Sequence, residues 1–275
     1  MNHCKTIAIV NQKGGVGKTT STVNLGVGLA QAGNRVLLVD DDPQHSLTIS
    51  LGIRNADDDL DTTLATAMQA EIRDESVPWE EGIIHSGEGV DLLPANIELS
   101  GVEMSLFNAM SREQVLKSVL SRVKENYDYI LIDCMPSLGL MSINALAAAD
   151  SVIIPTAPDF LSTKGLNLLI RTISRVRRQI NPKLKIDGIL MTMVDGRTNN
   201  AKSIIAALRS TVGSSVRVFD TEIPRSVRAA EASGEGKSIF TYDPKSRVAQ
   251  AYTNLTKEVA ELGKETNRSR SDGAR

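Results

Sequence analysis

The chain has 275 residues, 41% of them hydrophobic, which is enough to bury the core of one large domain. No segment approaches the ~18 consecutive apolar residues that a membrane-spanning helix needs, and the first residues do not resemble a signal peptide. The two cysteines, Cys4 and Cys134, are far apart and lack metal-binding spacing. The composition therefore excludes a transmembrane protein and leads us to expect a protein of the reduced cytoplasm.

The net charge of −2 hides an uneven distribution of charge along the chain. Residues 40–103 contain 16 acidic residues against two arginines, a net charge of −14. Residues 164–247 contain 16 lysines and arginines against 7 acidic residues, a net charge of +9. The basic half is a candidate surface for an anionic polymer, although a set of solvated helix faces would give the same excess.

Short aliphatic runs alternate with segments of helical periodicity. The aliphatic runs predict buried parallel strands at residues 6–10, 35–40, 129–133, 151–155 and 186–193. Helices are expected at residues 18–33, 111–124, 138–149, 161–179, 200–211 and 245–262. This alternation is typical of an α/β fold: a single-domain, doubly wound, mostly parallel sheet flanked by helices. We place the domain at residues 1–263 and expect the polar segment 264–275 to be a disordered tail.

The glycine-rich stretch "VNQKGGVGKTT" begins at Val10, between the first predicted strand and the first predicted helix. A glycine-rich turn at this junction directs backbone N–H groups and a helix N-terminus at one point, where phosphate binds. The ordinary phosphate-loop pattern fails, because Gln12 stands where its leading glycine should be. Lys18 would nevertheless reach the β- and γ-phosphates, and the Thr19 hydroxyl would bind Mg²⁺. The nucleotide-binding candidates in this loop are Lys13, Gly14, Gly15, Val16, Gly17, Lys18, Thr19 and Thr20.

Two further strands end in carboxylates. The run "RVLLVDDDPQ" ends in Asp40, Asp41 and Asp42, and "YDYILIDCMPS" ends in Asp133. Parallel strands present their carboxyl ends at the edge of the sheet that also carries the phosphate loop. Asp133 is therefore predicted to hold Mg²⁺, directly or through water. The aspartates before Pro43 would also be ordinary turn residues, so their prediction depends on the loop nearby.

The loop "KGGVGKTT" resembles the deviant Walker A motif of the ParA/MinD family of ATPases. The runs "VLLVDDDPQ", "YILIDCMPS", "TMVDGRTN", "IPRSVRAAEA" and "YDPKSRVAQAY" are similar to successive motifs of its Soj-like, chromosomal ParA branch. The resemblance covers nearly the whole chain. It implies a P-loop NTPase fold of the deviant Walker A type, with ATP and Mg²⁺ as cofactors.

The resemblance also implies roles for individual residues. Lys13 matches the signature lysine, which contacts the nucleotide of the other subunit in an ATP-dependent homodimer. A cation there would offset the repulsion between two facing triphosphates, although Lys13 would also serve as an ordinary loop cation. Asp42 is assigned to positioning the attacking water and Asp40 to supporting the Mg²⁺ shell, so the catalytic candidates are Lys13, Lys18 and Asp42. Pro224 and Arg225 match the loop along the adenine edge.

The implied function is DNA partition by a slow ATPase. The ATP-bound sandwich dimer of such proteins binds DNA without sequence preference, and a ParB-type partner stimulates hydrolysis and release, which would place this protein on the nucleoid. Arg197 and Arg228 match DNA-contacting positions, although they would alternatively pair with Asp195 and Glu231. Aromatic residues make up only 3% of the chain, so we expect phosphate contacts in place of base stacking.

Two other classes share the loop. A MinD-like, membrane-associated positioning ATPase requires an amphipathic C-terminal helix, whereas "NRSRSDGAR" offers no apolar face, so we expect no membrane partner. An iron–sulfur reductase requires cluster-ligating cysteines, and neither Cys4 nor Cys134 is suitably placed. Because the motif begins at residue 13, we also expect no N-terminal helix-turn-helix domain and no operator-specific repression.

Overall fold

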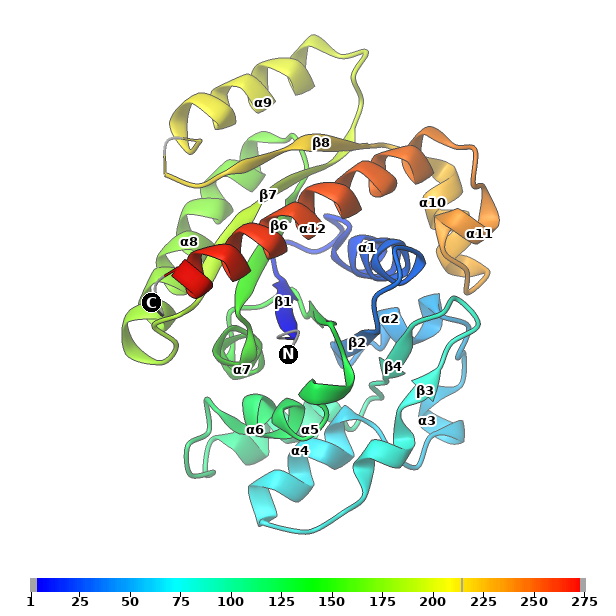
Figure 1. Ribbon diagram of the computed structural model, residues 1–275, viewed down its shortest axis with the longest axis vertical. Helices are drawn as coiled ribbons and strands as arrows, with labels where there is room; N and C mark the ends of the chain where they lie inside the picture. Colours follow the sequence, from blue (N-terminus) through cyan, green and yellow to red (C-terminus); the bar gives the residue numbers. More distant parts are fainter. Residues whose placement is uncertain (1–3, 214, 273–275) are drawn as a thin grey trace.

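An eight-stranded sheet runs through the centre of the computed structural model, which describes the backbone of residues 4–213 and 215–272 and most of their side chains (Figure 1). The strand order is β3-β4-β2-β5-β1-β6-β7-β8. Neighbouring strands are parallel except for β3 and β4. The strands are β1 (Lys5–Ile9), β2 (Val36–Asp41), β3 (Ile84–His85), β4 (Asp91–Leu93), β5 (Tyr129–Cys134), β6 (Ser151–Thr156), β7 (Lys185–Val194) and β8 (Val218–Pro224).

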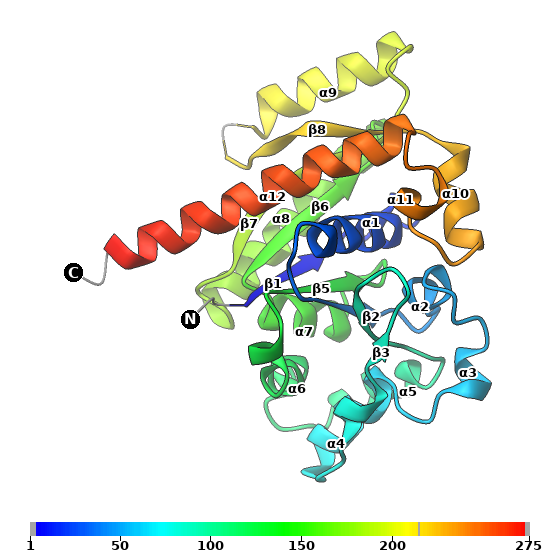
Figure 2. The same cartoon turned by 45° about the vertical axis from the view of Figure 1, so that its right-hand side comes forward.

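Helices cover both faces of this sheet (Figures 1 and 2). One buried cluster packs α4 to α9 on one face, and a second packs α1, α2, α10, α11 and α12 on the other. Successive side chains of β2 point to opposite faces of the sheet: Leu37 and Val39 belong to the first cluster, and Val36 and Leu38 belong to the second. The helices are α1 (Lys18–Gln31), α2 (Ser46–Ser50), α3 (Ala56–Asp59), α4 (Leu64–Arg73), α5 (Leu99–Leu106), α6 (Val115–Ser121), α7 (Leu140–Ala148), α8 (Phe160–Gln179), α9 (Asn199–Thr211), α10 (Val227–Gly234), α11 (Ile239–Tyr242) and α12 (Arg247–Asp272).

The predicted fold class is confirmed, and each predicted aliphatic run is a strand of the central part of the sheet. The sequence analysis missed β3 and β4, which are too short to show periodicity, and β8, in which polar residues interrupt the aliphatic run. It also missed the helices α2 to α5, α10 and α11. The helix predicted at residues 111–124 is shorter, because Ser111 has a φ of 50° and α6 begins only at Val115.

The C-terminal helix departs from the prediction in its length. Helix α12 runs from Arg247 to Asp272, so it overlaps most of the segment 264–275, whose expected disorder stays a prediction. Residues 273–275 lie outside the described residues. The boundary at residue 263 stays a prediction. Within residues 4–213 and 215–272, none of the helices combines the length and the apolar character needed to cross a membrane.

Candidate nucleotide-binding site

A cavity of about 590 Å³ opens at the carboxyl ends of the central strands. The glycine-rich loop between β1 and α1 forms one wall, and the start of α2 and the segment from β8 to α10 form others. This is the edge at which doubly wound sheets bind ligands. Of the residues predicted to bind nucleotide or to act in catalysis, the cavity is lined by Gly14, Gly15, Gly17, Lys18, Thr19, Thr20, Asp42 and Pro224.

The loop has the backbone conformation that its glycines allow. Gly15 and Gly17 have φ of 69° and 80°, in the left-handed region that disfavours other residues. A Cβ added at Gly14 or Gly15 would meet nothing within 4 Å, so a ligand can approach the backbone closely there. Val16 is buried and does not line the cavity, but its carbonyl accepts a hydrogen bond of 2.8 Å from the Thr192 hydroxyl. Val16 therefore anchors the loop to β7.

Lys18 is the first residue of α1, and its side chain is almost completely enclosed by the loop. The residue is only 8% exposed, and its Nζ donates to the Lys13 carbonyl at 3.4 Å. Burial lowers the pKa of Lys18, whereas the nearby Asp133 raises it. The lysine is thus a desolvated cation at the cavity wall, where binding an anion would stabilise its charge.

Thr19 and Asp133, the two predicted Mg²⁺ ligands, are in direct contact. The Thr19 hydroxyl donates to Asp133 Oδ2 at 2.6 Å, and the Thr22 hydroxyl donates to Oδ1 at 3.2 Å. Burial raises the pKa of Asp133 to about 7, although these hydrogen bonds and Lys18 oppose the shift. The Thr19 hydroxyl and the Asp133 carboxyl group therefore lie side by side beneath the glycine-rich loop.

Asp40 lies beside Asp133, as its register partner on the neighbouring strand. Its Oδ2 accepts hydrogen bonds from the Thr48 amide at 2.8 Å and the Thr48 hydroxyl at 2.7 Å. Its Oδ1 is buried without a protein partner, and burial followed by the charge of Asp133 raises its pKa to about 8. A buried, unsatisfied carboxyl oxygen of this kind fits a cation or its water.

The donor set fits Mg²⁺ better than a metal held by protein alone. Among the described residues, no group of three or more His, Cys, Asp or Glu side chains is arranged to hold a metal ion. Mg²⁺ commonly keeps water and is held by one or two protein oxygens together with substrate phosphates. Thr19, Asp133 and Asp40 would supply such oxygens.

Asp41 and Asp42 have different environments, although they are consecutive. Asp41 is fully buried beside Cys134 on the opposite face of the sheet from Asp40, and neither of its carboxyl oxygens has a hydrogen-bond partner. Asp42 follows the strand and lines the cavity, where its Oδ1 accepts a hydrogen bond of 2.9 Å from the Gln44 amide. The structure thus brings Asp42, but not Asp41, to the cavity.

Lys13 does not line the cavity of its own chain. Its Nζ lies 2.7 Å from Asp159 Oδ2, in the segment between β6 and α8. Its amide donates to Asn11 Oδ1 at 3.0 Å, and Asn11 in turn donates to the Pro155 carbonyl. The start of the loop is therefore attached to the end of β6, and a role for Lys13 in a second subunit stays a prediction.

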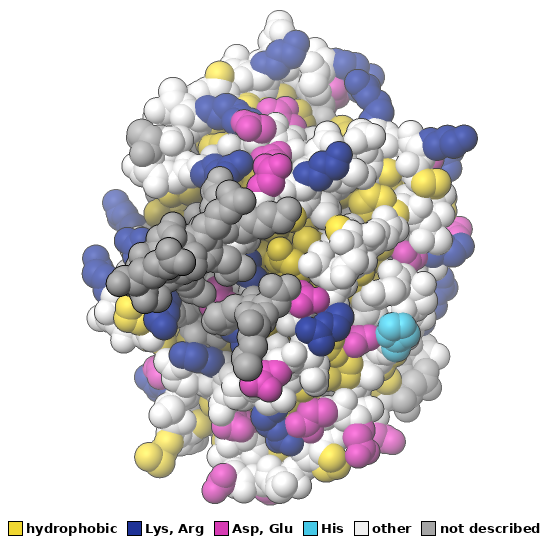
Figure 3. Space-filling model, in the orientation of Figure 1, with side chains coloured by type: hydrophobic (Ala, Val, Ile, Leu, Met, Phe, Trp, Pro, Cys, Tyr) yellow, Lys and Arg dark blue, Asp and Glu magenta, His cyan; other side chains and the backbone are white. Residues whose placement is uncertain are grey.

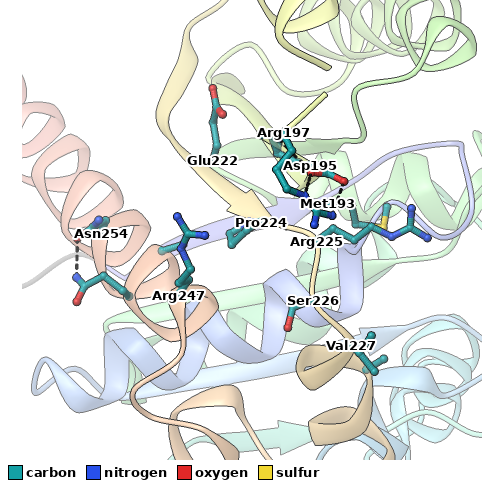
Figure 4. Close-up of a pocket in the computed structure, with 15 residues that line it drawn as sticks. Met193, Asp195, Arg197, Glu222, Pro224, Arg225, Ser226, Val227, Arg247 and Asn254 are labelled. Carbon is teal, nitrogen blue, oxygen red and sulfur yellow. Dashed lines mark hydrogen bonds and ion pairs between the residues drawn. The ribbon is translucent and has the colours of Figure 1, made fainter. Parts of the chain in front are cut away.

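A second groove, of about 1230 Å³, adjoins the cavity and shares Pro224 with it (Figure 4). Figure 4 shows Arg247 of α12 on one side of Pro224 and Arg225 on the other. Arg225 lines this neighbouring groove and not the cavity, and its contact with the adenine edge stays a prediction. Arg197 also lines the groove.

The two arginines predicted to contact DNA form the ion pairs considered as their alternative. Arg197 Nε lies 2.9 Å from Asp195 Oδ1, and this pairing lowers the pKa of Asp195 to about 2. Arg228 lies 3.8 Å from Glu231 and 3.9 Å from Asp243. The Arg197 side chain is still 90% exposed and that of Arg228 61% exposed. Exposed pairs of this kind are weak, so they leave both guanidinium groups able to bind phosphate.

Several residues at the site were missed by sequence reasoning. Thr192 had a usable signal, because it is a polar residue near the carboxyl end of a predicted strand. The sequence gives no signal for Thr22 and Thr48. Each lies in a helix, and its hydrogen bond to an aspartate of the site exists only because the fold brings the two residues together. Met193 lines both the cavity and the groove and has a φ of 51°, which no sequence pattern indicates.

Comparisons with known proteins agree with this geometry. A family model described as an AAA domain matches residues 4–186. The chain is 47% identical over 261 residues to the sporulation initiation inhibitor protein Soj of Bacillus subtilis, covering 94% of this chain and 99% of that protein. It is 41% identical over 260 residues to the chromosome partitioning protein ParA of Caulobacter vibrioides, covering 94% of each.

A solved structure shows the same architecture. It is described as cobyrinic acid a,c-diamide synthase from Mycobacterium smegmatis with bound ATP analog and magnesium. The TM-score is 0.81 at 35% sequence identity, and the match covers 92% of this chain and 93% of that one. The loop, the sheet and these relatives lead to one assignment: the chain belongs to the ParA/Soj family of P-loop ATPases.

Proposed function

We propose that this protein is a DNA-partitioning ATPase that uses ATP and Mg²⁺. The observation that carries the proposal is the contact of 2.6 Å between Thr19 and Asp133 beneath a glycine loop whose Lys18 is buried at the cavity wall. Relatives named for chromosome partition support the biological role, and a relative described with an ATP analog and magnesium supports the cofactors.

A bound Mg²⁺ would supply positive charge that offsets the charge developing on the β- and γ-phosphates. Thr19 and Asp133 would hold this ion, and the buried Asp40 carboxyl would accept hydrogen bonds from its water. Lys18 binds the phosphates, and Asp42 orients the attacking water at the mouth of the cavity. Neither arginine nor glutamine is among the described residues that line the cavity, which supports slow hydrolysis in the absence of a partner.

Dimerisation is the second part of the proposal. Two protomers would sandwich two ATP molecules, and Lys13 of each would reach the nucleotide of the other. A lysine supplied in this way stabilises the negative charge of the phosphates in a poorly solvated interface. By analogy with arginine fingers, it would raise the rate of ATP hydrolysis by about 10³ to 10⁵. The position of Lys13 outside its own cavity supports this role.

The dimer would bind DNA without sequence preference and remain on the nucleoid in the cytoplasm. The exposed Arg197 and Arg228, together with the Arg225 and Arg247 side chains in the adjoining groove, offer phosphate contacts. A ParB-type partner would stimulate hydrolysis and so release the DNA. ATP would thus set the time that the protein spends on DNA.

The proposal is tested by the oligomeric state of wild type, Asp42→Ala and Lys13→Ala with ATP and Mg²⁺, measured by light scattering. We expect Asp42→Ala to accumulate as a dimer because it cannot hydrolyse ATP, and Lys13→Ala to remain monomeric. Asp220→Ala, which changes an aspartate that is 90% exposed on β8, is the matched control and should behave as wild type. A monomeric Asp42→Ala with normal turnover would contradict the residue assignment.

A further inference from the structure

Helix α8 and the turn that follows it carry a concentration of positive charge. Residues 160–186 contain seven lysines and arginines and neither aspartate nor glutamate. Residues 196–219, which include α9 on the same face of the sheet, contain four lysines and arginines and again no acidic residue. Figure 3 shows Lys and Arg side chains along the left edge of the molecule, where α8 lies in Figure 1. A run of one sign of charge is a candidate surface for an anion.

Three arginines of α8 lie on one side of the helix. Arg171, Arg175 and Arg178 follow one another at intervals of four and three residues, and all three are exposed. The opposite side of α8 is buried in the core and consists of Leu166, Leu169, Ile173 and Val176. We call the three exposed arginines the α8 stripe.

The carboxylates around α8 are engaged elsewhere. Those that flank α8 in the chain, or that follow the neighbouring α7, each pair with a lysine: Asp159 with Lys13, Asp187 with Lys5 and Asp150 with Lys124. Arg175 Nε donates to the neutral Gln179 Oε1 at 3.3 Å. In the part of the chain that the structure describes, no carboxylate forms an ion pair with the α8 stripe. The guanidinium groups are therefore available to an external anion.

The helix dipole accounts for only part of the stripe. Cations in the last turn of a helix are stabilising, and Arg178 lies in that turn of α8. Arg171 and Arg175 lie before it. The end of the helix is held in place, because the Asn181 side chain donates to the Ala149 carbonyl, just after α7, at 2.7 Å. The stripe is thus presented by a fixed element.

The spacing of the stripe suits the phosphates of duplex DNA. Arg171 and Arg178 are separated by about 10 Å along the helix axis. One strand of a duplex carries a phosphate about every 3.4 Å of its axis, so about three phosphates span this length. A lipid surface would instead require an apolar face that can enter the bilayer, and the apolar side of α8 is buried in the core. Among the described side chains of α8, Leu168 is the one large apolar side chain that is exposed.

We propose that the α8 stripe is a second DNA-binding surface, which binds phosphates in the absence of nucleotide. Helices α10 and α12, which carry Arg228 and Arg247, pack on the opposite face of the sheet from α8. The stripe also lies within one protomer, so it needs no dimer. It would hold the nucleotide-free protein weakly on DNA between rounds of ATP binding. The inference rests on the proposed function for the identity of the polyanion.

The test measures binding of the purified full chain to a fluorescently labelled random-sequence duplex, without nucleotide, by anisotropy over a salt series. We expect Arg171→Gln/Arg175→Gln/Arg178→Gln to bind at least about tenfold more weakly at low salt, and to reduce the slope of log affinity against log salt by about 3. The charge-keeping variant Arg171→Lys/Arg175→Lys/Arg178→Lys should bind within about threefold of wild type, because phosphate attracts either cation. This lysine variant separates loss of charge from loss of folding.

A matched control removes the same amount of charge from other exposed positions, on α4, before α6 and on α6: Arg73→Gln/Arg112→Gln/Lys117→Gln. It should keep the wild-type slope. The inference is overturned if the glutamine variant of the stripe binds as wild type, or if the lysine variant or the control loses as much affinity as the glutamine variant. Wild type that binds phosphatidylserine vesicles or polyglutamate, but not DNA, at the same salt concentration would also overturn it. A DNA affinity that ATP fails to raise would contradict the proposed function and leave this inference standing.

Discussion

Lys13 Nζ lies 2.7 Å from Asp159 Oδ2, so the lysine proposed to act on a second subunit is bound within its own chain. The Lys13 side chain is 39% exposed and that of Asp159 41% exposed. An ion pair this exposed contributes about 0.2–1 kcal/mol, because solvent screens it. The Lys13 side chain can therefore leave Asp159 when the second protomer of a dimer presents a nucleoside triphosphate, which carries more negative charge than the Asp159 carboxylate.

Replacing Asp159 should consequently favour the dimer. We expect Asp159→Asn to lower the ATP concentration needed for half-maximal dimerisation by up to about fivefold, the equivalent of 1 kcal/mol. Light scattering across an ATP titration measures this shift. Asp57→Asn is the control, because that aspartate also lies outside the cavity. Weaker dimerisation of Asp159→Asn would show that Asp159 positions the lysine for its task.

Asp41 is expected to destabilise the fold. Its carboxyl group is buried with no hydrogen-bond partner for either oxygen, and burial raises its pKa well above 3.8. The folded protein therefore keeps this proton at pH values where the unfolded chain has lost it, so stability falls as the pH rises above 3.8. Asp41→Leu should raise the free energy of unfolding by about 1–3 kcal/mol, and by more at higher pH.

Urea unfolding at about pH 5 and about pH 8 measures this effect. Asp41→Asn keeps the shape of the side chain but removes its ionisation, so it should lose the part of the pH dependence that Asp41 contributes, without the full gain in stability, while the parts from Asp40 and Asp133 remain. An Asp41→Leu variant less stable than wild type at both pH values would mean that the carboxyl group has a partner in solution.

Gly26 is expected to be required for the packing of α1 on the sheet. A Cβ at this position would lie 2.6 Å from Leu38 Cδ2, and Leu38 is fully buried. Gly26→Ala should therefore cost about 1–2 kcal/mol in thermal or urea unfolding, despite the better helix propensity of alanine. In the control Gly101→Ala, on α5, the added Cβ meets nothing within 4 Å, so that variant should be stabilised by up to about 1 kcal/mol. Equal effects of the two substitutions would exclude a packing role for Gly26.

The central strands and the loop could be predicted from the sequence because their signals are local. Lys18 and Thr19 lie in one contiguous motif, and Asp133 follows an uninterrupted aliphatic run, so the strand order alone brings them together. The short strands β3 and β4 could not be predicted, since two or three residues carry no periodicity. The disorder of residues 264–275 was inferred from polarity alone and stays a prediction, although α12 is longer than the predicted helix at residues 245–262.

Contacts between distant residues were beyond sequence reasoning. Asp159 is 146 residues from Lys13 in sequence, in a segment without a recognisable pattern. The different environments of Asp40, Asp41 and Asp42 depend on which face of β2 each residue occupies and on where the strand ends. A run of three aspartates does not reveal this, because strand register is set by packing on both faces.

Arg197 and Arg228 are expected to contribute to DNA affinity through phosphate contacts. Each alanine substitution should weaken binding equally for DNA of different sequences and reduce the slope of log affinity against log salt by about 1. Fluorescence anisotropy over a salt series, with ATP present, gives this slope. Lys117→Ala, on α6, is the control and should leave the slope unchanged. A loss of affinity that depends on DNA sequence would contradict phosphate binding.

The central claim is that ATP controls DNA binding by this chain. It is tested most directly by measuring the affinity of wild type for a random-sequence duplex with ATP, with ADP and without nucleotide, with Mg²⁺ present throughout. We predict tight binding with ATP alone, retained by Asp42→Ala and lost by Lys13→Ala. Equal affinity under all three conditions would contradict the account.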